Sequence, residues 1–197
     1  MYVVYREVGA CDTCDVSRLR QIDRAGVLQA ALVVADECGL DGLTMHRVAE
    51  RLAVTPMALY RHVANKADLL DGLVEQLLGE ITSSDTTTAD DQLLAAGQAV
   101  RTVARRHPTV FPLLLQRPAS TPAALRARDR VYEALRNHGI AEKDVARVER
   151  LVSTTILGFA ASEVSGRFEA HSRKKMDADF SALTAMIRAG LSEYTTH

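Results

Sequence analysis

TMHRVAERLAVTPMALYRHVANK, which spans residues 44–66, is the stretch of this sequence that decides the fold. Its first part predicts a short amphipathic helix over Met45–Leu52, because apolar residues recur there three and four positions apart. Thr44 precedes this helix and can cap its free N–H groups through its hydroxyl. Ala53 then turns the chain. In this turn a left-handed backbone would cost Ala about 1 kcal/mol relative to Gly.

The second part of the stretch begins with Thr55-Pro56. Threonine is a common N-cap, and proline fits the first helical position because its missing N–H would have no partner there. We therefore expect a second helix from Pro56 to His62 or Val63. Two short helices joined by a tight turn predict a helix-turn-helix, whose second helix can enter a DNA major groove.

The charge of the whole chain favours no class of partner, since 24 Lys and Arg stand against 25 Asp and Glu. Residues 44–66 differ, because four basic residues stand there against Glu50 alone: Arg47, Arg51, Arg61 and Lys66. A local basic patch is what contacts with DNA phosphates require. The alternative interpretation is an ordinary solvated helix face.

From Val27 to about Leu78 the sequence resembles the TetR-type bacterial transcriptional repressors. The resemblance is carried by AALVVADECGLDGLTMHRVAERLAV, by MALYRHVANK and by LLDGL at 69–73. LYRHV-x-NK followed by LLD is specific, and it is most similar to the tetracycline repressor branch. The resemblance implies a homodimer with a DNA-binding head and a helical body that binds an unknown small-molecule effector. It also implies phosphate contacts by Tyr60, His62 and Lys66.

The bases of the operator should be contacted by His46, Arg47 and the start of the second helix. The tetracycline repressor branch has Arg at the position of His46 and polar residues at Pro56 and Ala58, so we do not expect this chain to bind the tetracycline operator. The predicted DNA-binding residues are Thr44, Met45, His46, Arg47, Thr55, Pro56, Met57, Ala58, Tyr60, Arg61, His62 and Lys66.

The whole chain predicts an all-α fold of about nine helices. We expect a loose leader over 1–21, a three-helix DNA-binding domain over 22–66, a connecting helix over 67–81, and a ligand-binding and dimerisation domain over 89–197. The first helix should run from Ile22 to Cys38, with Cys38 buried on its apolar stripe and Gly39 ending it. The connecting helix should carry ligand-induced movement to the head.

The ends and cysteines of the chain suggest a cytoplasmic protein. The sequence has no run of 18 apolar residues and no secretory signal pattern, and only three cysteines. Cys11 and Cys14 form a CxxC, which fits a redox pair, half of a zinc site or an unstructured leader. With no second pair of ligands nearby, we expect no metal and no cofactor.

The body should end in two long helices, 141–166 and 176–194, that pair with their two-fold copies in the homodimer. The alternative is that their apolar stripes face only their own core. Candidate ligand-pocket residues, chosen as polar or aromatic residues within apolar helices, are Arg101, His107, Phe111, Gln116, Tyr132, Thr155 and Phe159.

No motif typical of an enzyme is found, and the acidic pairs lie at expected helix starts, where they complement the helix dipole. Three hypotheses follow. The first is a dimeric DNA-binding repressor released from a palindromic operator by a ligand. The second is an enzyme or carrier for a small hydrophobic molecule, and the third is a protein-interaction module.

Overall fold

Nine helices and no extended strand occur in residues 22–81, 89–167 and 172–195, the parts of the chain that this computed structural model describes. The prediction of an all-α fold is therefore confirmed. The predicted leader over 1–21, with Cys11 and Cys14, lies outside the described residues. None of the described helices is long and apolar enough to cross a bilayer.

Three helices form the head: α1 (Arg24–Gly42), α2 (Met45–Leu52) and α3 (Pro56–Leu59). Asp23 caps α1 by accepting a hydrogen bond from the Gly26 N–H at 2.7 Å. The regular part of α1 ends where predicted, because Gly39 has a φ of 76°. The expectation of a buried Cys38 was wrong: its side chain is exposed, one position before the backbone turns.

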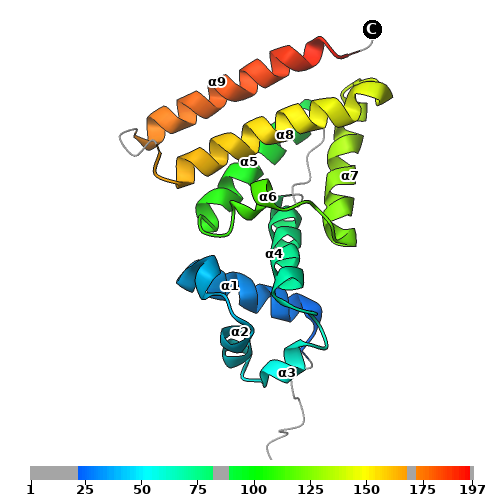
Figure 1. The fold of residues 1–197 in the computed structure, drawn as a ribbon. Helices are drawn as coiled ribbons and strands as arrows, with labels where there is room; N and C mark the ends of the chain where they lie inside the picture. Colours follow the sequence, from blue (N-terminus) through cyan, green and yellow to red (C-terminus); the bar gives the residue numbers. More distant parts are fainter. Residues whose placement is uncertain (1–21, 82–88, 168–171, 196–197) are drawn as a thin grey trace, which may run out of the picture.

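The connecting helix α4 (Lys66–Ile81) rises from the head into the body (Figure 1). Its start follows the sequence, since Asn65 accepts a hydrogen bond from the Asp68 N–H at 3.0 Å. Gly72 allows α4 to approach α1 closely. A Cβ atom at this position would lie 2.1 Å from a methyl carbon of Leu28, which is itself buried.

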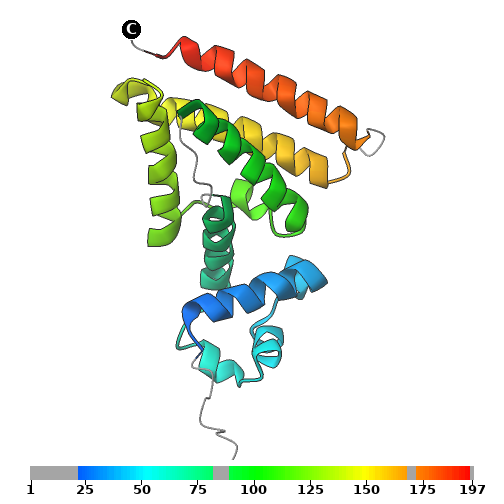
Figure 2. The same cartoon turned by 180° about the vertical axis from the view of Figure 1, so that it is seen from behind.

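Five helices form the body: α5 (Ala89–Arg106), α6 (Leu113–Gln116), α7 (Pro122–Asn137), α8 (Glu142–Val164) and α9 (Arg173–Ser192). α8 and α9 run side by side at the end of the molecule farthest from the head (Figures 1 and 2). α9 begins three residues before the predicted Met176, because Ser172 accepts a hydrogen bond from the Lys175 N–H at 3.3 Å and so caps it.

One hydrophobic cluster runs without interruption from the head through α4 into the body. It extends from Val27 in α1 through Leu73 in α4 to Phe111, which precedes α6, and reaches Phe180 in α9. A smaller cluster around Leu135 joins the far ends of α7, α8 and α9. Because head and body share a core, a change in the body can reach the head through packed side chains.

Candidate nucleic-acid interface and ligand cavity

The α2–α3 turn has the backbone that the sequence suggested. The Thr44 hydroxyl accepts a hydrogen bond from the Arg47 N–H at 3.2 Å, as expected of an N-cap. Ala53 is left-handed, with φ 54° and ψ 42°, and its N–H bonds back to the carbonyls of Ala49 and Glu50. Ala53 therefore holds a conformation that Gly adopts more readily.

The second helix of the motif is shorter than predicted. α3 ends at Leu59 and does not reach His62 or Val63. The following residues form turns instead, with the N–H groups of His62 and Val63 both donating to the Leu59 carbonyl. Leu59 and Val63 are buried, and their burial against the core outweighs the helical preference of the residues between them. Thr55 occupies the cap position, but its hydroxyl makes no capping bond.

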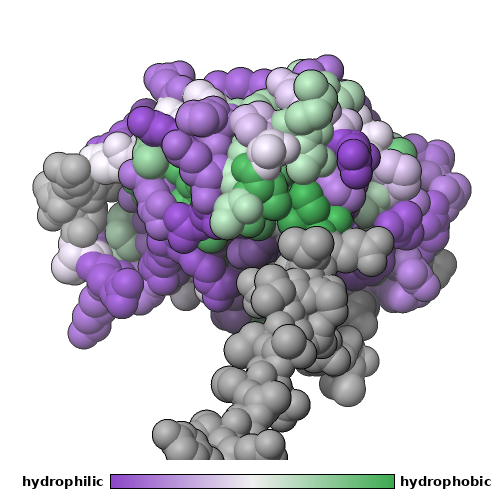
Figure 3. Space-filling view, turned by 90° about the horizontal axis from the view of Figure 1, so that it is seen from below, coloured by the Kyte–Doolittle hydropathy of each residue, from purple (hydrophilic) through white to green (hydrophobic). Residues whose placement is uncertain are grey.

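The predicted DNA-binding residues share one property, which is that none is buried. Met57, with 74 % of its surface exposed, and Tyr60, with 50 %, are two of the most exposed large apolar residues in the described chain. Thr44, His46, Arg47, Thr55, Arg61 and Lys66 are exposed, while Met45, Pro56, Ala58 and His62 are half-buried. From below, the molecule shows a mostly hydrophilic surface with a small hydrophobic area near its centre (Figure 3).

Most cationic side chains of this surface make few contacts within the protein. The Arg47 guanidinium donates to the Gly42 carbonyl at 3.3 Å, and the Lys66 ammonium donates to the Leu40 carbonyl at 3.2 Å. Arg61 has no hydrogen bond or ion pair with any residue that the structure describes. Arg51, which the sequence count included, instead pairs with Glu37 at 2.8 Å. Arg47, Arg61 and Lys66 therefore remain the cations available to an anionic partner.

A hydrogen-bonded link fixes the end of the helix-turn-helix to α4. Arg24 donates to the His62 carbonyl at 3.0 Å and pairs with Asp68 at 2.8 Å. Asp68 also accepts from the Ala64 N–H at 2.8 Å. The hydrogen bond from Arg24 is the main reason that the pKa of Asp68 is lowered. The position of the turn after α3 is thus tied to the first turn of α4.

A cavity of about 460 Å³ lies within the body between α4, α5, α6, α7 and α8. Most of its lining is apolar, and small residues such as Gly97 and Ala127 leave the space open. Three charged residues, Arg117, Arg128 and Glu149, also face it. Its size and lining are those of a site for a small, largely apolar molecule.

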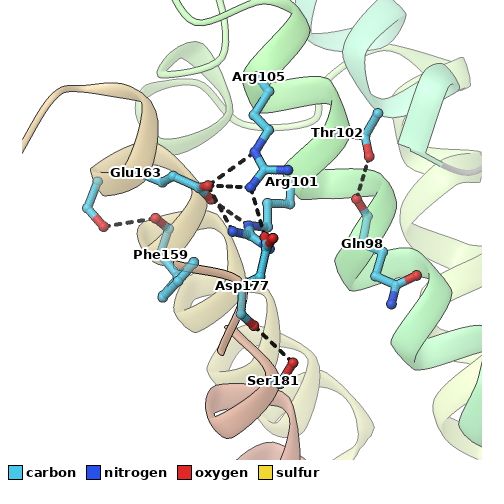
Figure 4. Close-up of polar contacts among 9 residues, drawn as sticks. Gln98, Arg101, Thr102, Arg105, Phe159, Glu163, Asp177 and Ser181 are labelled. Atoms are coloured by element: carbon cyan, nitrogen blue, oxygen red, sulfur yellow. Dashed lines mark hydrogen bonds and ion pairs between the residues drawn. The ribbon is translucent and has the colours of Figure 1, made fainter. Parts of the chain in front are cut away.

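None of the seven predicted pocket residues lines this cavity. Arg101 lies in an ion cluster with Arg105, Glu163 and Asp177 (Figure 4). Its guanidinium is 2.5 Å from Glu163 and 2.8 Å from Asp177, and it stacks 4.9 Å from the centre of the Phe180 ring. Burial disfavours the Glu163 carboxylate, but the hydrogen bonds from Arg101 and Arg105 prevail, and the pKa of Glu163 is lowered.

His107 lies at the junction of head and body. Its Nδ1 is 2.6 Å from Asp36 of α1, and its Nε2 is 3.2 Å from Glu80 of α4. Arg106 pairs with Glu80 as well, at 2.6 Å. The side chain of His107 is buried. It therefore joins three helices rather than facing the cavity.

The other predicted pocket residues have separate places. Phe111 is fully buried in the core, and Gln116 is exposed. Tyr132 lies beside Arg128 and Arg136, and Phe159 packs on Phe180 with ring centres 5.4 Å apart. Thr155 borders a smaller groove of about 160 Å³ between α8 and α9.

The sequence did contain a signal for the lining of this cavity. Arg117-Pro118 has the pattern of a helix stop, yet both residues also line the cavity. The small residues at positions 96, 97, 119 and 127 lie where larger residues would have filled the space. Small residues on several facing helices, rather than aromatic ones, were the sign of an open cavity.

Two family models match this chain over most of its length. One, described as bacterial regulatory proteins of the tetR family, matches residues 27–73. The other, described as the C-terminal domain of tetracyclin repressor-like proteins, matches residues 93–187. The first covers the helix-turn-helix, and the second covers most of the cavity lining.

Characterised relatives agree with these matches. An HTH-type transcriptional regulator of Saccharopolyspora erythraea is 30 % identical over 183 residues, which are 87 % of this chain and 77 % of that protein. The class A tetracycline repressor protein from transposon 1721 of Escherichia coli is 48 % identical over 65 residues, which are 33 % of this chain and 30 % of the repressor. The higher identity is thus confined to a shorter stretch.

Solved structures share the fold over nearly their whole length. A variant of TetR from Acinetobacter baumannii AYE, in complex with minocycline, has a TM-score of 0.74 and 26 % identity, covering 90 % of this chain and 100 % of that one. BioQ with its double-stranded DNA operator has a TM-score of 0.69 and 28 % identity, covering 87 % and 98 %.

Proposed function

Because this chain belongs to the TetR family of bacterial transcriptional regulators, we propose that it is a homodimeric repressor that a small molecule releases from a palindromic operator. The observation that carries this proposal is the pairing of an exposed cationic helix-turn-helix with a separate apolar cavity in one molecule. BioQ with its DNA operator and TetR with minocycline share the fold, which supports both operator binding and small-molecule binding in the proposal. Such a repressor acts on chromosomal DNA in the cytoplasm.

In this proposal the head divides its contacts by chemistry. Tyr60, His62 and Lys66, together with Arg61, contact phosphates, which fixes the position of the head on the duplex. His46 and Arg47 contact base edges, and Met57 makes apolar contacts with thymine methyl groups. The remaining predicted residues, Thr44, Met45, Thr55, Pro56 and Ala58, complete the surface that faces the groove.

Dimerisation through α8 and α9 has support from their exposed faces. Leu151 of α8 and Met186 of α9 have 53 % and 71 % of their surfaces exposed. The apolar seam expected along α9 serves its own chain in part, because Phe180 is buried in the same core. A two-fold dimer would place two heads in successive major grooves, about 34 Å apart.

Selection of binding sites from random DNA tests the proposal even though the operator is unknown. We expect a two-fold-symmetric consensus, bound by two chains, from which an effector releases the protein. A variant with Arg47 replaced by Ala should select a different consensus, whereas Lys66→Met should weaken binding to all sites alike. Recovery of no consensus by the wild type would overturn the proposal and favour a carrier of small apolar molecules, since the cavity would suit that function as well.

A further inference from the structure

We propose that the cavity takes an amphipathic molecule with an anionic group, and that this group acts on α4 by drawing Arg117 away from Asp71. The inference rests on the proposed function, because it assumes that the cavity is the effector site. Its basis is the double position of Arg117, which lines the cavity and also binds α4.

The contacts of Arg117 with α4 are well defined. Its Nε donates to Asp71 Oδ1 at 2.8 Å, and its Nη2 lies 2.7 Å from the same oxygen. Nη2 also donates to the carbonyl of Ala67 at 3.3 Å, within the first turn of α4. Arg117 itself caps the C-terminus of α6. One side chain therefore connects the wall of the cavity to the start of the connecting helix.

The charges of the lining indicate the class of ligand. Among its described residues, two arginines stand against one carboxylate, that of Glu149. Arg128 stacks over the Tyr132 ring at 5.5 Å, and the nearest carboxylate with which it pairs is that of Asp129 at 3.8 Å. A ligand with an anionic group can bond to such guanidinium groups while its apolar part covers the walls.

An anionic ligand competes most strongly with Asp71 for Arg117. A carboxylate or sulfonate group forms the same charge-assisted hydrogen bonds that Asp71 forms now, whereas a neutral apolar ligand would leave the pair intact. Exchange is feasible because Arg117 and Asp71 both retain 27 % side-chain exposure, so water can solvate the displaced carboxylate.

Loss of the Arg117 contacts would affect the first turns of α4, which lie next to the head. Ala67 and Asp71 flank Asp68, whose partner Arg24 holds the carbonyl of His62 in the turn that follows α3. Release at Ala67 and Asp71 therefore frees the first turns of α4, to which the helix-turn-helix is anchored. An anionic ligand changes the head because it binds the two states of this link unequally.

Two fluorescent dyes that differ in one group test the inference without DNA, so its failure is separate from a failure to bind an operator. They are 1-anilinonaphthalene-8-sulfonate and its neutral parent, N-phenyl-1-naphthylamine. The wild type should bind the sulfonate dye about tenfold or more tightly than the neutral dye, which corresponds to one charge-assisted hydrogen bond. Equal affinity for both dyes would overturn the proposal.

Variants on the two sides of the ion pair should act in opposite directions. Arg117→Gln should lose the preference for the sulfonate dye and keep its affinity for the neutral one. Asp71→Asn removes the competitor without changing the lining, so it should bind the sulfonate dye several-fold more tightly. The inference would be contradicted if Arg117→Gln lowered the affinity for both dyes alike, or if Asp71→Asn bound the sulfonate dye more weakly than the wild type. Circular dichroism of each variant confirms that it is folded.

Two controls locate the dye and its effect. Glu149→Gln removes a charge from the same lining but makes no change to α4, so it should not lower the affinity for the sulfonate dye. Ser153→Phe should exclude both dyes from the cavity. Hydrogen exchange of residues 64–71 should rise with the sulfonate dye and not with the neutral one. Tighter binding of a lipophilic cation, retained binding in Ser153→Phe, or equal exchange with both dyes would overturn the proposal.

Discussion

Arg61 in the head and Arg101 in the body show two opposite uses of arginine in this molecule. In the head, Arg61 is exposed and has no partner among the described residues, and Arg51 forms an ion pair on the surface. In the body, Arg101 is 7 % exposed and bonds to two carboxylates while it stacks on Phe180. Arg101 is buried and held between two carboxylates, so an external anion cannot reach it, whereas the exposed Arg61 can bind one.

The largest expected effect on stability comes from the buried ion cluster around Arg101. Replacing Arg101 with Met should reduce the free energy of unfolding by about 3 kcal/mol, because it leaves the charge of Glu163 buried with Arg105 as its remaining partner. Replacing Arg51 with Met in the head should cost less than about 1 kcal/mol, since both members of that pair are exposed. Urea denaturation measures both, and similar losses would remove the distinction drawn between the two regions.

Close packing between head and α4 should be the next most sensitive feature. Gly72→Ala should destabilise the protein by about 1–3 kcal/mol, because the new methyl group overlaps Leu28. Gly79 lies in the same helix, and no side chain of the described residues would come within 4 Å of a Cβ atom added there, so Gly79→Ala should be neutral or stabilising. Equal thermal shifts in the two variants would show that α1 and α4 are not closely packed at Gly72.

The ion cluster of the body should also make the free energy of unfolding depend on pH. The pKa of Glu163 in the folded state lies below its ordinary value of 4.5, despite burial, because Arg101 and Arg105 donate to it. Its contribution is therefore fully present above pH 4.5 and is lost as the pH falls through the folded-state value. Denaturation between about pH 3 and pH 6 should show a steeper acid loss in the wild type than in Glu163→Gln. Parallel curves would contradict this assignment.

The smallest predicted effect concerns the turn of the helix-turn-helix. Ala53→Gly should stabilise the protein by up to about 1 kcal/mol, because the left-handed backbone at this position costs Ala more than Gly. Thermal unfolding measures the change. A loss of stability would mean that the greater freedom of Gly in the unfolded chain outweighs the relief of strain.

Local features of the fold could be predicted from the sequence because they depend on neighbouring residues. Thr44, Asn65 and Thr121 act as N-caps through their own side chains, and α7 begins at Pro122, a residue suited to the first helical position. The length of α3 could not be predicted in this way. It depends on the burial of Leu59 and Val63 against other helices, which local preference does not describe.

The cavity was harder to predict than the helices because its lining comes from five helices, α4 to α8, that are spread along the sequence. Arg101 and His107 are polar residues within apolar helices, as expected of pocket residues. Their partners, Glu163 and Asp36, lie 62 and 71 positions away, and the sequence alone does not indicate these pairings. The surface proposed to contact DNA was simpler to predict, since its residues lie within one stretch of the chain. Its local pattern predicted the basic charge, and the structure leaves none of the predicted residues buried.

The most direct test of the central claim is the salt dependence of operator binding, measured by fluorescence anisotropy on the site obtained by selection. We expect Arg61→Gln to fold normally and to reduce the slope of log affinity against log salt by about 1 per chain, or about 2 for the dimer. Arg126→Gln, which removes an exposed cation from the body outside the cavity lining, should leave the slope unchanged. An unchanged slope in Arg61→Gln, or equal changes in both variants, would show that the exposed cations of the head do not contact DNA.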